Sequence, residues 1–260
     1  MGNRGKPVPG RWRSIMKTRI SLVLCALLLS ACATTSAPPE DRHPDDPWEP
    51  FNRSMYAFNS AADRAVLRPV ARGYDKVTPQ PIQRSVRNFF RNLRSPVIMV
   101  NLMLQGRGSD LEDEFQRFLT NSLYGIGGLF DVASAANIDR HESDFGQTLA
   151  GWGWEESRFV MLPVFGPSTA RDTWGRAVDT FPDPAWELAF SKGSWGLLGL
   201  RIIDLRAGLL PLDAELAAAY DEYALIRDGW MQRRNFFIFG GDVDVPDYDA
   251  WLDDEDWDDW

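Results

Sequence analysis

The chain has 260 residues and a net charge of −9, from 28 basic and 37 acidic residues. Residues 1–31 carry six of the basic residues and no acidic one, so the rest of the chain holds 22 basic against 37 acidic residues. This acidic balance disfavours nucleic acid as a partner. The part after residue 31 is long enough for one sizeable domain, which we expect to be its only one.

The first 31 residues have the features of a bacterial signal peptide that ends in a lipobox. Basic residues precede an apolar run at 20–31 of about twelve residues, shorter than the roughly 20 that a membrane-spanning helix needs. The sequence Leu-Ser-Ala-Cys at 29–32 predicts cleavage before Cys32 and attachment of diacylglycerol to its thiol. The alternative is an ordinary secretory signal with a chance cysteine. Ala33 replaces the aspartate typical of inner-membrane retention, which favours the periplasmic face of a Gram-negative outer membrane.

A tether and a helix are predicted next. Residues 32–47 are rich in proline and in small or charged residues, which predicts a flexible link to a folded domain over residues 48–240. Apolar residues then recur at steps of three and four, as on one face of a helix. They are Phe51, Met55, Phe58, Ala62 and Val66. We expect this helix to end near Pro69 because proline interrupts helical hydrogen bonding.

The following helix is predicted to start at Pro79 or Pro81 and to run to about residue 93. One face is apolar, with Ile82, Val86, Phe89 and Leu93. The opposite face is lined by Arg84, Arg87, Arg91 and Arg94. This pattern fits a helix in a membrane interface whose guanidinium groups contact lipid headgroups, and it fits an ordinary surface helix equally well.

Three further segments precede the middle of the chain. Residues 96–104 are almost wholly apolar but too short to cross a bilayer, so they are either core or half-inserted. Ser109 and Glu112 form a capping-box pattern that predicts a new helix. Its expected buried side carries Leu111, Phe115, Phe118, Leu119 and Leu123. The glycine-rich residues 125–132 should then bend or form a hairpin.

The second half of the domain is predicted to be helical as well. Residues 144–153 and 168–181 favour helices, the latter with Ser168 as its N-cap, and residues 159–162 favour a short extended piece. Residues 186–210 fit two helices or one bent helix, while 213–239 is expected to be the longest helical stretch. No alternating strand pattern persists, which predicts an all-α fold.

The tail at residues 241–260 is acidic and contains tryptophans. We expect it to be disordered, with docking to a basic partner as the alternative interpretation.

The sequence offers little for catalysis or metal binding. His43 lies in the tether, His141 lies in a polar loop, and Cys32 is the only cysteine left after cleavage. No zinc motif, free nucleophilic thiol or calcium-loop spacing is present. The acidic pairs at 155–156 and 221–222 are adjacent in sequence, so on a helix their side chains point to different faces. We expect no enzymatic activity, no metal and no cofactor.

Several motifs resemble those of the VacJ/MlaA-type outer-membrane lipoproteins, which maintain lipid asymmetry. In the first half they are DPWEPFNRSMYAFN at 46–59, LRPV at 67–70, VRNFFRNLRSP at 86–96 and NLMLQG at 101–106. Further along they are RFLTNSLYGIGGLFDVAS at 117–134, DFGQTLAGWG at 144–153, LPVFGPSTARD at 162–172 and YDEYALIRDGWMQRRNF at 220–236. A common Gly-Pro-Tyr before the Leu-Pro motif is replaced here by EESRF at 155–159.

The resemblance implies a single ring-like helical domain seated in one membrane leaflet beside a trimeric porin, with no spanning helix. Phospholipids misplaced in the outer leaflet would pass through its pore to a soluble periplasmic shuttle. The family hairpin that lines and supports the pore corresponds to Gly125, Gly127, Gly128, Leu129, Phe130 and Asp131. Phe58 and Asn59 fall in the region that biases the pore open or closed.

The resulting hypothesis is retrograde phospholipid transport without bond making or breaking. A structural tether between membrane and porin is the first alternative. A lipoprotein enzyme that acts on lipid or cell wall is the second.

Overall fold

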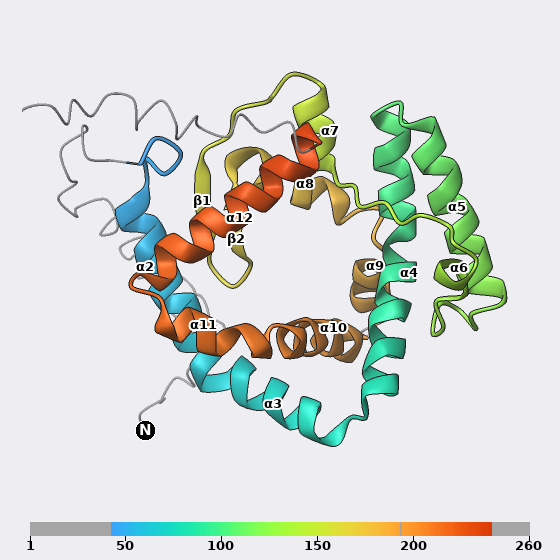
Figure 1. Ribbon diagram of the computed structural model, residues 1–260, viewed down its shortest axis with the longest axis horizontal. Helices are drawn as coiled ribbons and strands as arrows, with labels where there is room; N and C mark the ends of the chain where they lie inside the picture. Colours follow the sequence, from blue (N-terminus) through green and yellow to red (C-terminus); the bar gives the residue numbers. More distant parts are fainter. Residues whose placement is uncertain (1–42, 193, 241–260) are drawn as a thin grey trace, which may run out of the picture.

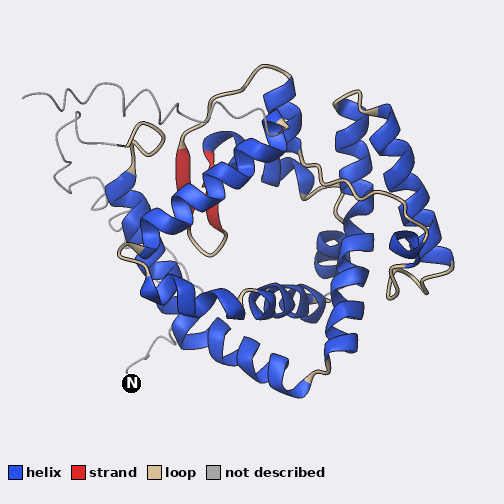
Figure 2. Cartoon of the chain, in the orientation of Figure 1, coloured by secondary structure: helices blue, strands red, loops and turns tan. Residues whose placement is uncertain are grey.

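The described residues form a ring of helices with one short β-hairpin. The computed structural model describes residues 43–240 except residue 193, so the predicted signal peptide, Cys32 and the tail after residue 240 lie outside them. Figure 1 shows the helices following one another around the middle of the molecule, and Figure 2 marks the two strands. Within residues 43–240, no helix is both long and apolar enough to span a membrane. The predicted ring-like, mostly helical domain is confirmed.

The packed structure begins before Trp48. Asp46 is completely buried. Its carboxylate accepts a hydrogen bond from Asn52 Nδ2 at 2.7 Å and another from the Tyr223 hydroxyl, and Arg227 lies 3.4 Å away. A buried carboxylate is stable only when it is paired in this way. The predicted boundary between residues 47 and 48 therefore lies slightly too late in the chain.

The first helix does not end at Pro69, and that prediction is wrong. Helix α2 (Glu49–Ala62) continues through a π-helical segment (Asp63–Leu67) into α3 (Arg68–Val77). Within the π-helical segment, the Arg68 N–H donates to the Asp63 carbonyl five residues back. Pro69 then lies in the first turn of α3, where its missing N–H is tolerated.

Helix α4 (Gln80–Leu104) is one helix of 25 residues where the sequence predicts two segments. Pro96 lies inside it. An interior proline removes a backbone hydrogen bond, but α4 is packed by later helices on several sides, which compensates for this loss. For the same reason its buried residues include Gln83, Asn92 and Asn101 and do not form a single apolar face.

Helix α5 (Gly108–Leu123) packs on α4 and is followed by the short α6 (Val132–Ala135). Both lie on the side of α4 that faces away from the middle of the ring in Figure 1. The predicted capping box does not form, because Ser109 Oγ donates to Asp110 and no side chain caps the helix. The buried residues of α5 are Glu114, Arg117 and Asn121, so the prediction of an apolar buried side is also wrong.

The centre of the chain builds two crossed helices and the hairpin. Helix α7 (Phe145–Gly151) is followed by strands β1 (Phe159–Leu162) and β2 (Gly166–Thr169) and by α8 (Ala170–Asp179). The antiparallel strands pair Phe159 with Thr169, which confirms the predicted extended piece. Thr169, and not Ser168, caps α8 by accepting from the Asp172 N–H. A Cβ on Gly175 would lie 2.4 Å from the Gly146 nitrogen, so glycine permits the close α7–α8 crossing.

Four helices complete the ring. They are α9 (Pro184–Lys192), α10 (Trp195–Gly208), α11 (Asp213–Ala218) and α12 (Glu222–Phe239), with a 3-10 turn at Leu210–Leu212. Residues 186–210 thus form two helices, one of the two predicted possibilities. The predicted single helix over 213–239 is broken, because Asp221 caps a new helix by accepting from the Ala224 N–H.

A small apolar core joins the two ends of the domain. Phe159, Met161 and Tyr223 are buried and are surrounded by Met55, Tyr56, Ile226, Trp230 and Met231. This core connects α2, β1 and α12. Near the other end of α12, Arg234 donates to Asp144 at 2.6 Å and to Asp172 at 2.7 Å, which ties α12 to α7 and α8. The ring is therefore closed by contacts between residues far apart in sequence.

Candidate functional site

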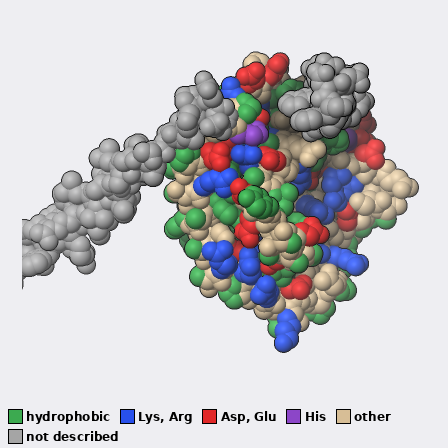
Figure 3. Space-filling view, turned by 60° about the vertical axis from the view of Figure 1, so that its left-hand side comes forward, with side chains coloured by type: hydrophobic (Ala, Val, Ile, Leu, Met, Phe, Trp, Pro, Cys, Tyr) green, Lys and Arg blue, Asp and Glu red, His purple; other side chains and the backbone are tan. Residues whose placement is uncertain are grey.

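The surface of the domain carries many large apolar side chains. Figure 3 shows apolar side chains distributed between charged ones on the face that carries the start of the domain. One group of them follows α5 and the loop after it, and we call it the α5 apolar patch. It consists of the exposed Phe115, Leu119, Leu123, Tyr124, Ile126 and Phe130. Because α5 buries polar residues at the same time, its orientation is the reverse of that expected for a helix packed in water.

The loop between α5 and α6 contains the glycines singled out in the sequence. Gly127 and Gly128 have φ angles of +68° and +89°. A Cβ on Gly125 would lie 2.2 Å from the Phe130 carbonyl oxygen, and one on Gly128 would lie 2.4 Å from the Asn92 Cβ. The Gly128 N–H also donates to the Asn121 carbonyl at 2.8 Å. The predicted bend is confirmed, and the loop is folded tightly onto α4 and α5.

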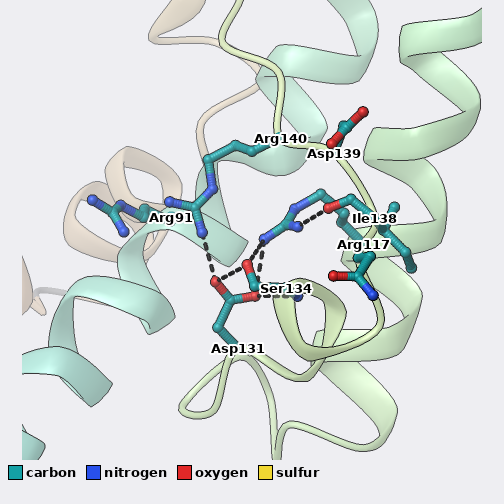
Figure 4. Close-up of a pocket in the computed structure, with 8 residues that line it drawn as sticks. Arg91, Arg117, Asp131, Ser134, Ile138, Asp139 and Arg140 are labelled. Carbon is teal, nitrogen blue, oxygen red and sulfur yellow. Dashed lines mark hydrogen bonds and ion pairs between the residues drawn. The ribbon is translucent and has the colours of Figure 1, made fainter.

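Asp131 ends this loop and organises a polar cluster, shown in Figure 4. Its carboxylate accepts from Arg117 at 2.9 Å and from Arg140 at 2.6 Å. It also caps α6 by accepting from the Ser134 N–H at 3.2 Å. Burial alone would raise the pKa of the Asp131 carboxyl, but the hydrogen bonds from Ser134 and the Arg117 charge lower it. Asp131 is therefore an anion held between two arginines.

The four arginines of α4 have different environments. Arg84 is exposed. Arg87 lies 3.6 Å from Asp204 of α10, which also accepts from the Tyr74 hydroxyl at 3.0 Å. Arg91 borders the Asp131 cluster, as the close-up in Figure 4 shows.

The last of the four, Arg94, acts electrostatically on Asp144 and Asp179 at the α7–α8 side. The sequence thus places all four on one helix, while the fold directs them to separate neighbours. Their contact with lipid headgroups stays a prediction.

Asn59 holds the turn of the β-hairpin. Its side chain donates to the Leu162 carbonyl at 2.8 Å and accepts from the Val164 N–H at 2.7 Å. Val164 has a φ of +68°, an unfavourable value for a β-branched residue, so the turn depends on this external clamp. Phe58, the neighbour of Asn59, is exposed. The predicted gating region is therefore in direct contact with the hairpin.

The comparisons with known proteins decide the family. The family model for the MlaA lipoprotein matches residues 44–237. The chain belongs to the MlaA lipoprotein family. The intermembrane phospholipid transport system lipoprotein MlaA of Escherichia coli (strain K12) is 39% identical over 235 residues, which cover 88% of this chain and 92% of that protein. The MlaA lipoprotein of Haemophilus influenzae is 32% identical over 231 residues, covering 86% and 92%.

A solved MlaA-like structure supports the same conclusion. It comes from work on the structural basis for maintenance of bacterial outer membrane lipid asymmetry, and it aligns with a TM-score of 0.66. The sequences are 38% identical, and the alignment covers 74% of this chain and 98% of that one. The MlaA fold is thus shared almost throughout the solved chain, and the resemblance found in the sequence is confirmed.

Several structural features of this MlaA domain were not predicted. No pattern in the sequence indicates that Arg117 and Arg140 share Asp131, or that Asn59 clamps the hairpin, because these contacts join separate elements. The Asp131 cap had a local signal, since an aspartate precedes the helical residues 132–135. Among the described residues, no group of three or more His, Cys, Asp or Glu side chains is arranged to hold a metal ion.

Proposed function

We propose that this protein removes misplaced phospholipids from the outer leaflet of the outer membrane and passes them to a soluble periplasmic shuttle. Support comes from its family and from relatives named as intermembrane phospholipid transport lipoproteins, which it matches over most of their length. The proposed step is physical and breaks no bond. One lipid moves by its headgroup along a polar route, while its acyl tails stay in apolar surroundings.

The observation that carries the proposal is the reversed orientation of α5. Glu114 and Arg117 are each 4% exposed, whereas Leu123 is 71% exposed on the same helix. In water this arrangement leaves large apolar side chains solvated without any compensating gain. In contact with lipid tails, the same side chains are in a favourable environment and the polar ones stay hydrogen-bonded inside. The arrangement therefore supports a domain seated in one leaflet.

Three parts of the domain would form or support the proposed lipid route: α4, the loop at residues 125–131 and the β-hairpin. Buried or half-buried polar groups along α4 would accommodate a headgroup, and the loop at residues 125–131 would support the pore from its position against α4. Asn59 would influence the pore through the hairpin turn that it clamps. Phe58 and the α4 arginines Arg84, Arg91 and Arg94 are further candidates for contact with the lipid.

Two partners and an anchor complete the proposal. Diacylated Cys32 would anchor the domain to the inner leaflet, because several acyl chains give durable attachment. A trimeric porin would hold the ring in place, and a soluble shuttle would receive the lipid on the periplasmic side. A Cys32→Ala variant should therefore be misplaced and should fail to restore transport, whereas normal function from such a soluble form would contradict the anchoring role.

The decisive experiment is complementation of a host strain that lacks its own copy of the gene. The strain should accumulate surface phospholipid, measured with an outer-leaflet-specific acyltransferase, and become sensitive to detergent. Expression of this chain should reverse both effects. Surface phospholipid and detergent resistance that are unchanged by the deletion would contradict the proposal. Hydrolysis of phospholipid or glycan by the purified protein would favour an enzyme instead.

A second experiment separates a lipid conduit from a structural tether. Photoreactive residues introduced one at a time along residues 125–134, but not at the exposed apolar positions 126, 129 and 130, should yield lipid adducts if this stretch borders the route. A tether to a porin should give protein adducts alone. Charged substitutions that face the route should abolish transport but leave porin association intact, and a tether would tolerate them.

A further inference from the structure

A cavity of about 510 Å³ lies outside the ring, between α4, α5, α6 and the segment that leads to α7. It is lined by Arg91, Arg117, Asp131, Ser134, Asn137, Ile138, Asp139 and Arg140. Figure 4 shows the side chains of Arg117 and Arg140 reaching the Asp131 carboxylate, while the Arg91 side chain lies on the other side of Arg140. The cavity therefore gathers three arginine side chains, two of them bound to one carboxylate.

The three arginines differ in how many of their N–H donors are already used in hydrogen bonds within the protein. Arg117 is 4% exposed and is used internally, since it donates to Asp131, to Ser134 and to the Ile138 carbonyl. Among the residues that the structure describes, Arg140 contacts only Asp131, and most of its donors are left over. Within the described part of the chain, Arg91 has neither a hydrogen bond nor an ion pair. The cavity thus contains two guanidinium groups with unused donors.

The charges around Arg91 also favour the binding of an anion. Its burial and the nearby charges of Arg140 and Arg87 lower the pKa of Arg91 from the ordinary value, and they outweigh the opposing charges of Glu142 and Asp131. It remains charged, because arginine does not lose its proton in proteins at physiological pH. The carboxylates of Glu142 and Asp131 act on this cation from a distance, and no ion pair joins them to it among the described residues, so an anion that enters the cavity would stabilise it.

We propose that Arg91 and Arg140 bind the phosphate group of a glycerophospholipid on the outer flank of the ring. Guanidinium groups match phosphate oxygens through paired N–H donors, which makes arginine well suited to this ligand. Arg117 and Asp131 are positioning residues, because the shared carboxylate holds Arg140 in place. The site rests on the proposed function, since it presumes that the domain meets phospholipids. It adds a second place, beside the route through the ring, where one is held.

The neighbouring surface favours a lipid over free phosphate as the source of this group. Leu129 and Phe130 come immediately before Asp131, and they are 38% and 55% exposed. Phe130 belongs to the α5 apolar patch, and together with Leu129 it brings exposed apolar surface up to Asp131, which lines the cavity. A phosphate bound by Arg91 and Arg140 would thus lie next to a surface that can cover acyl chains. Inorganic phosphate would contact the two arginines but would make no use of the apolar surface.

The test measures binding to the purified full-length lipoprotein in a neutral detergent by isothermal titration calorimetry. Three probes separate the sources: dihexanoyl phosphatidylglycerol, glycerol 3-phosphate and inorganic phosphate. The short-chain lipid should bind most tightly, and Arg91→Gln and Arg140→Gln should each weaken it by about tenfold, as for the loss of one charged hydrogen-bond contact. Arg91→Gln removes no internal partner, so its fold should be unchanged, which circular dichroism will verify.

Arg64→Gln is the matched control. It removes the same charge from an exposed position in the π-helical segment after α2, and it does not line the cavity. Its affinity for the short-chain lipid should stay within about twofold of the parent. Equal affinities for the lipid in the parent and in Arg91→Gln would overturn the site. Equal affinities of the parent for the lipid and for inorganic phosphate would overturn the lipid as its ligand.

The failure of this site is distinguishable from failure of the proposed function. Binding is measured on the purified protein, whereas transport is measured as surface phospholipid in cells. Unchanged surface phospholipid in the deletion strain would contradict transport, whatever the titration gives. If Arg91→Gln has normal lipid affinity while the parent gene restores lipid asymmetry, the site is excluded and the transport function stands.

Discussion

Gly128 packs so closely on Asn92 that an added Cβ would lie 2.4 Å from the Asn92 Cβ. The same glycine has a φ of +89°, which disfavours every residue with a side chain. Asn92 in turn donates to Ser122 Oγ at 3.0 Å, so it links α4 to α5 beneath the loop. The loop at residues 125–131 is thus a fixed part of the α4–α5 interface.

Substitution of this glycine should release the loop. Gly128→Ala combines a left-handed backbone with a steric clash, and we expect it to lower the free energy of unfolding by about 3 kcal/mol. Gly127→Ala is the control, because its φ is also positive but nothing lies within 4 Å of the added Cβ. It should cost only about 1 kcal/mol. Denaturant unfolding of both variants in detergent checks the difference, and equal losses would show that the close packing is unimportant.

The two hydrogen bonds between Asn59 and the hairpin turn should stabilise that turn. Asn59→Ala removes the acceptor of the Val164 N–H and the donor to the Leu162 carbonyl. Loss of these bonds should destabilise the turn by about 1.4 kcal/mol and speed exchange of the Val164 amide hydrogen by about tenfold. Phe58→Ala changes the exposed neighbour without touching the turn and serves as control. An exchange rate that is equal in Asn59→Ala and the parent would contradict the clamp.

Some features were predictable because their signals are local. The bend at residues 125–132 follows from its glycines, and the strand at Phe159–Leu162 from a short apolar run. The burial of α5 was not predictable in the same way. Its polar residues Glu114, Arg117 and Asn121 have the same helical spacing as its apolar ones, so the pattern shows two faces but not which one is inside. The expectation that the apolar face packs inward selected the wrong face.

Long-range contacts account for the other differences. Helix α4 passes through Pro96 because the helices packed around it stabilise the whole length, which no window of its own sequence reveals. The proposed phosphate site also depends on contacts between residues far apart in sequence. Arg91 and Arg140 are 49 positions apart in the numbering, and only the fold brings them to one cavity. The sequence could identify Arg91 as a candidate, but Arg140 had no distinguishing pattern.

The ion pair between α2 and α12 predicts a dependence on pH. Hydrogen bonds from Arg53 and from the Ala224 N–H lower the pKa of Asp221 to about 2. Because the folded-state pKa is below the ordinary 3.8, this pair stabilises the fold above about pH 4, and the contribution is lost as the pH falls towards 2. Asp221→Asn keeps the N-cap but removes the charge.

Unfolding at several pH values tests this dependence. Asp221→Asn should be less stable than the parent at pH 7, and the difference should shrink between pH 4 and pH 2 on the basis of the lowered pKa. Glu156→Gln is the control, since the Glu156 side chain is 90% exposed and lies 3.9 Å from Arg158. A difference between Asp221→Asn and the parent that stays constant with pH would contradict the assignment to this ion pair.

The α5 apolar patch gives the most direct test of contact with lipid. Leu123→Asp places a carboxylate on an exposed apolar position, so it should have little effect on folding in detergent and should weaken binding to lipid vesicles. For an anion at a lipid-facing site we expect a cost of about 2 kcal/mol, or roughly a thirtyfold loss of vesicle partitioning. Ser109→Asp, in the polar first turn of the same helix, introduces the same charge at an exposed position outside the patch and should lose less than about threefold.

Co-sedimentation with phosphatidylethanolamine and phosphatidylglycerol vesicles measures both variants. If Leu123→Asp and Ser109→Asp lose the same amount, the patch faces something other than the bilayer, and the reversed burial of Glu114 and Leu123 would need a protein partner to explain it.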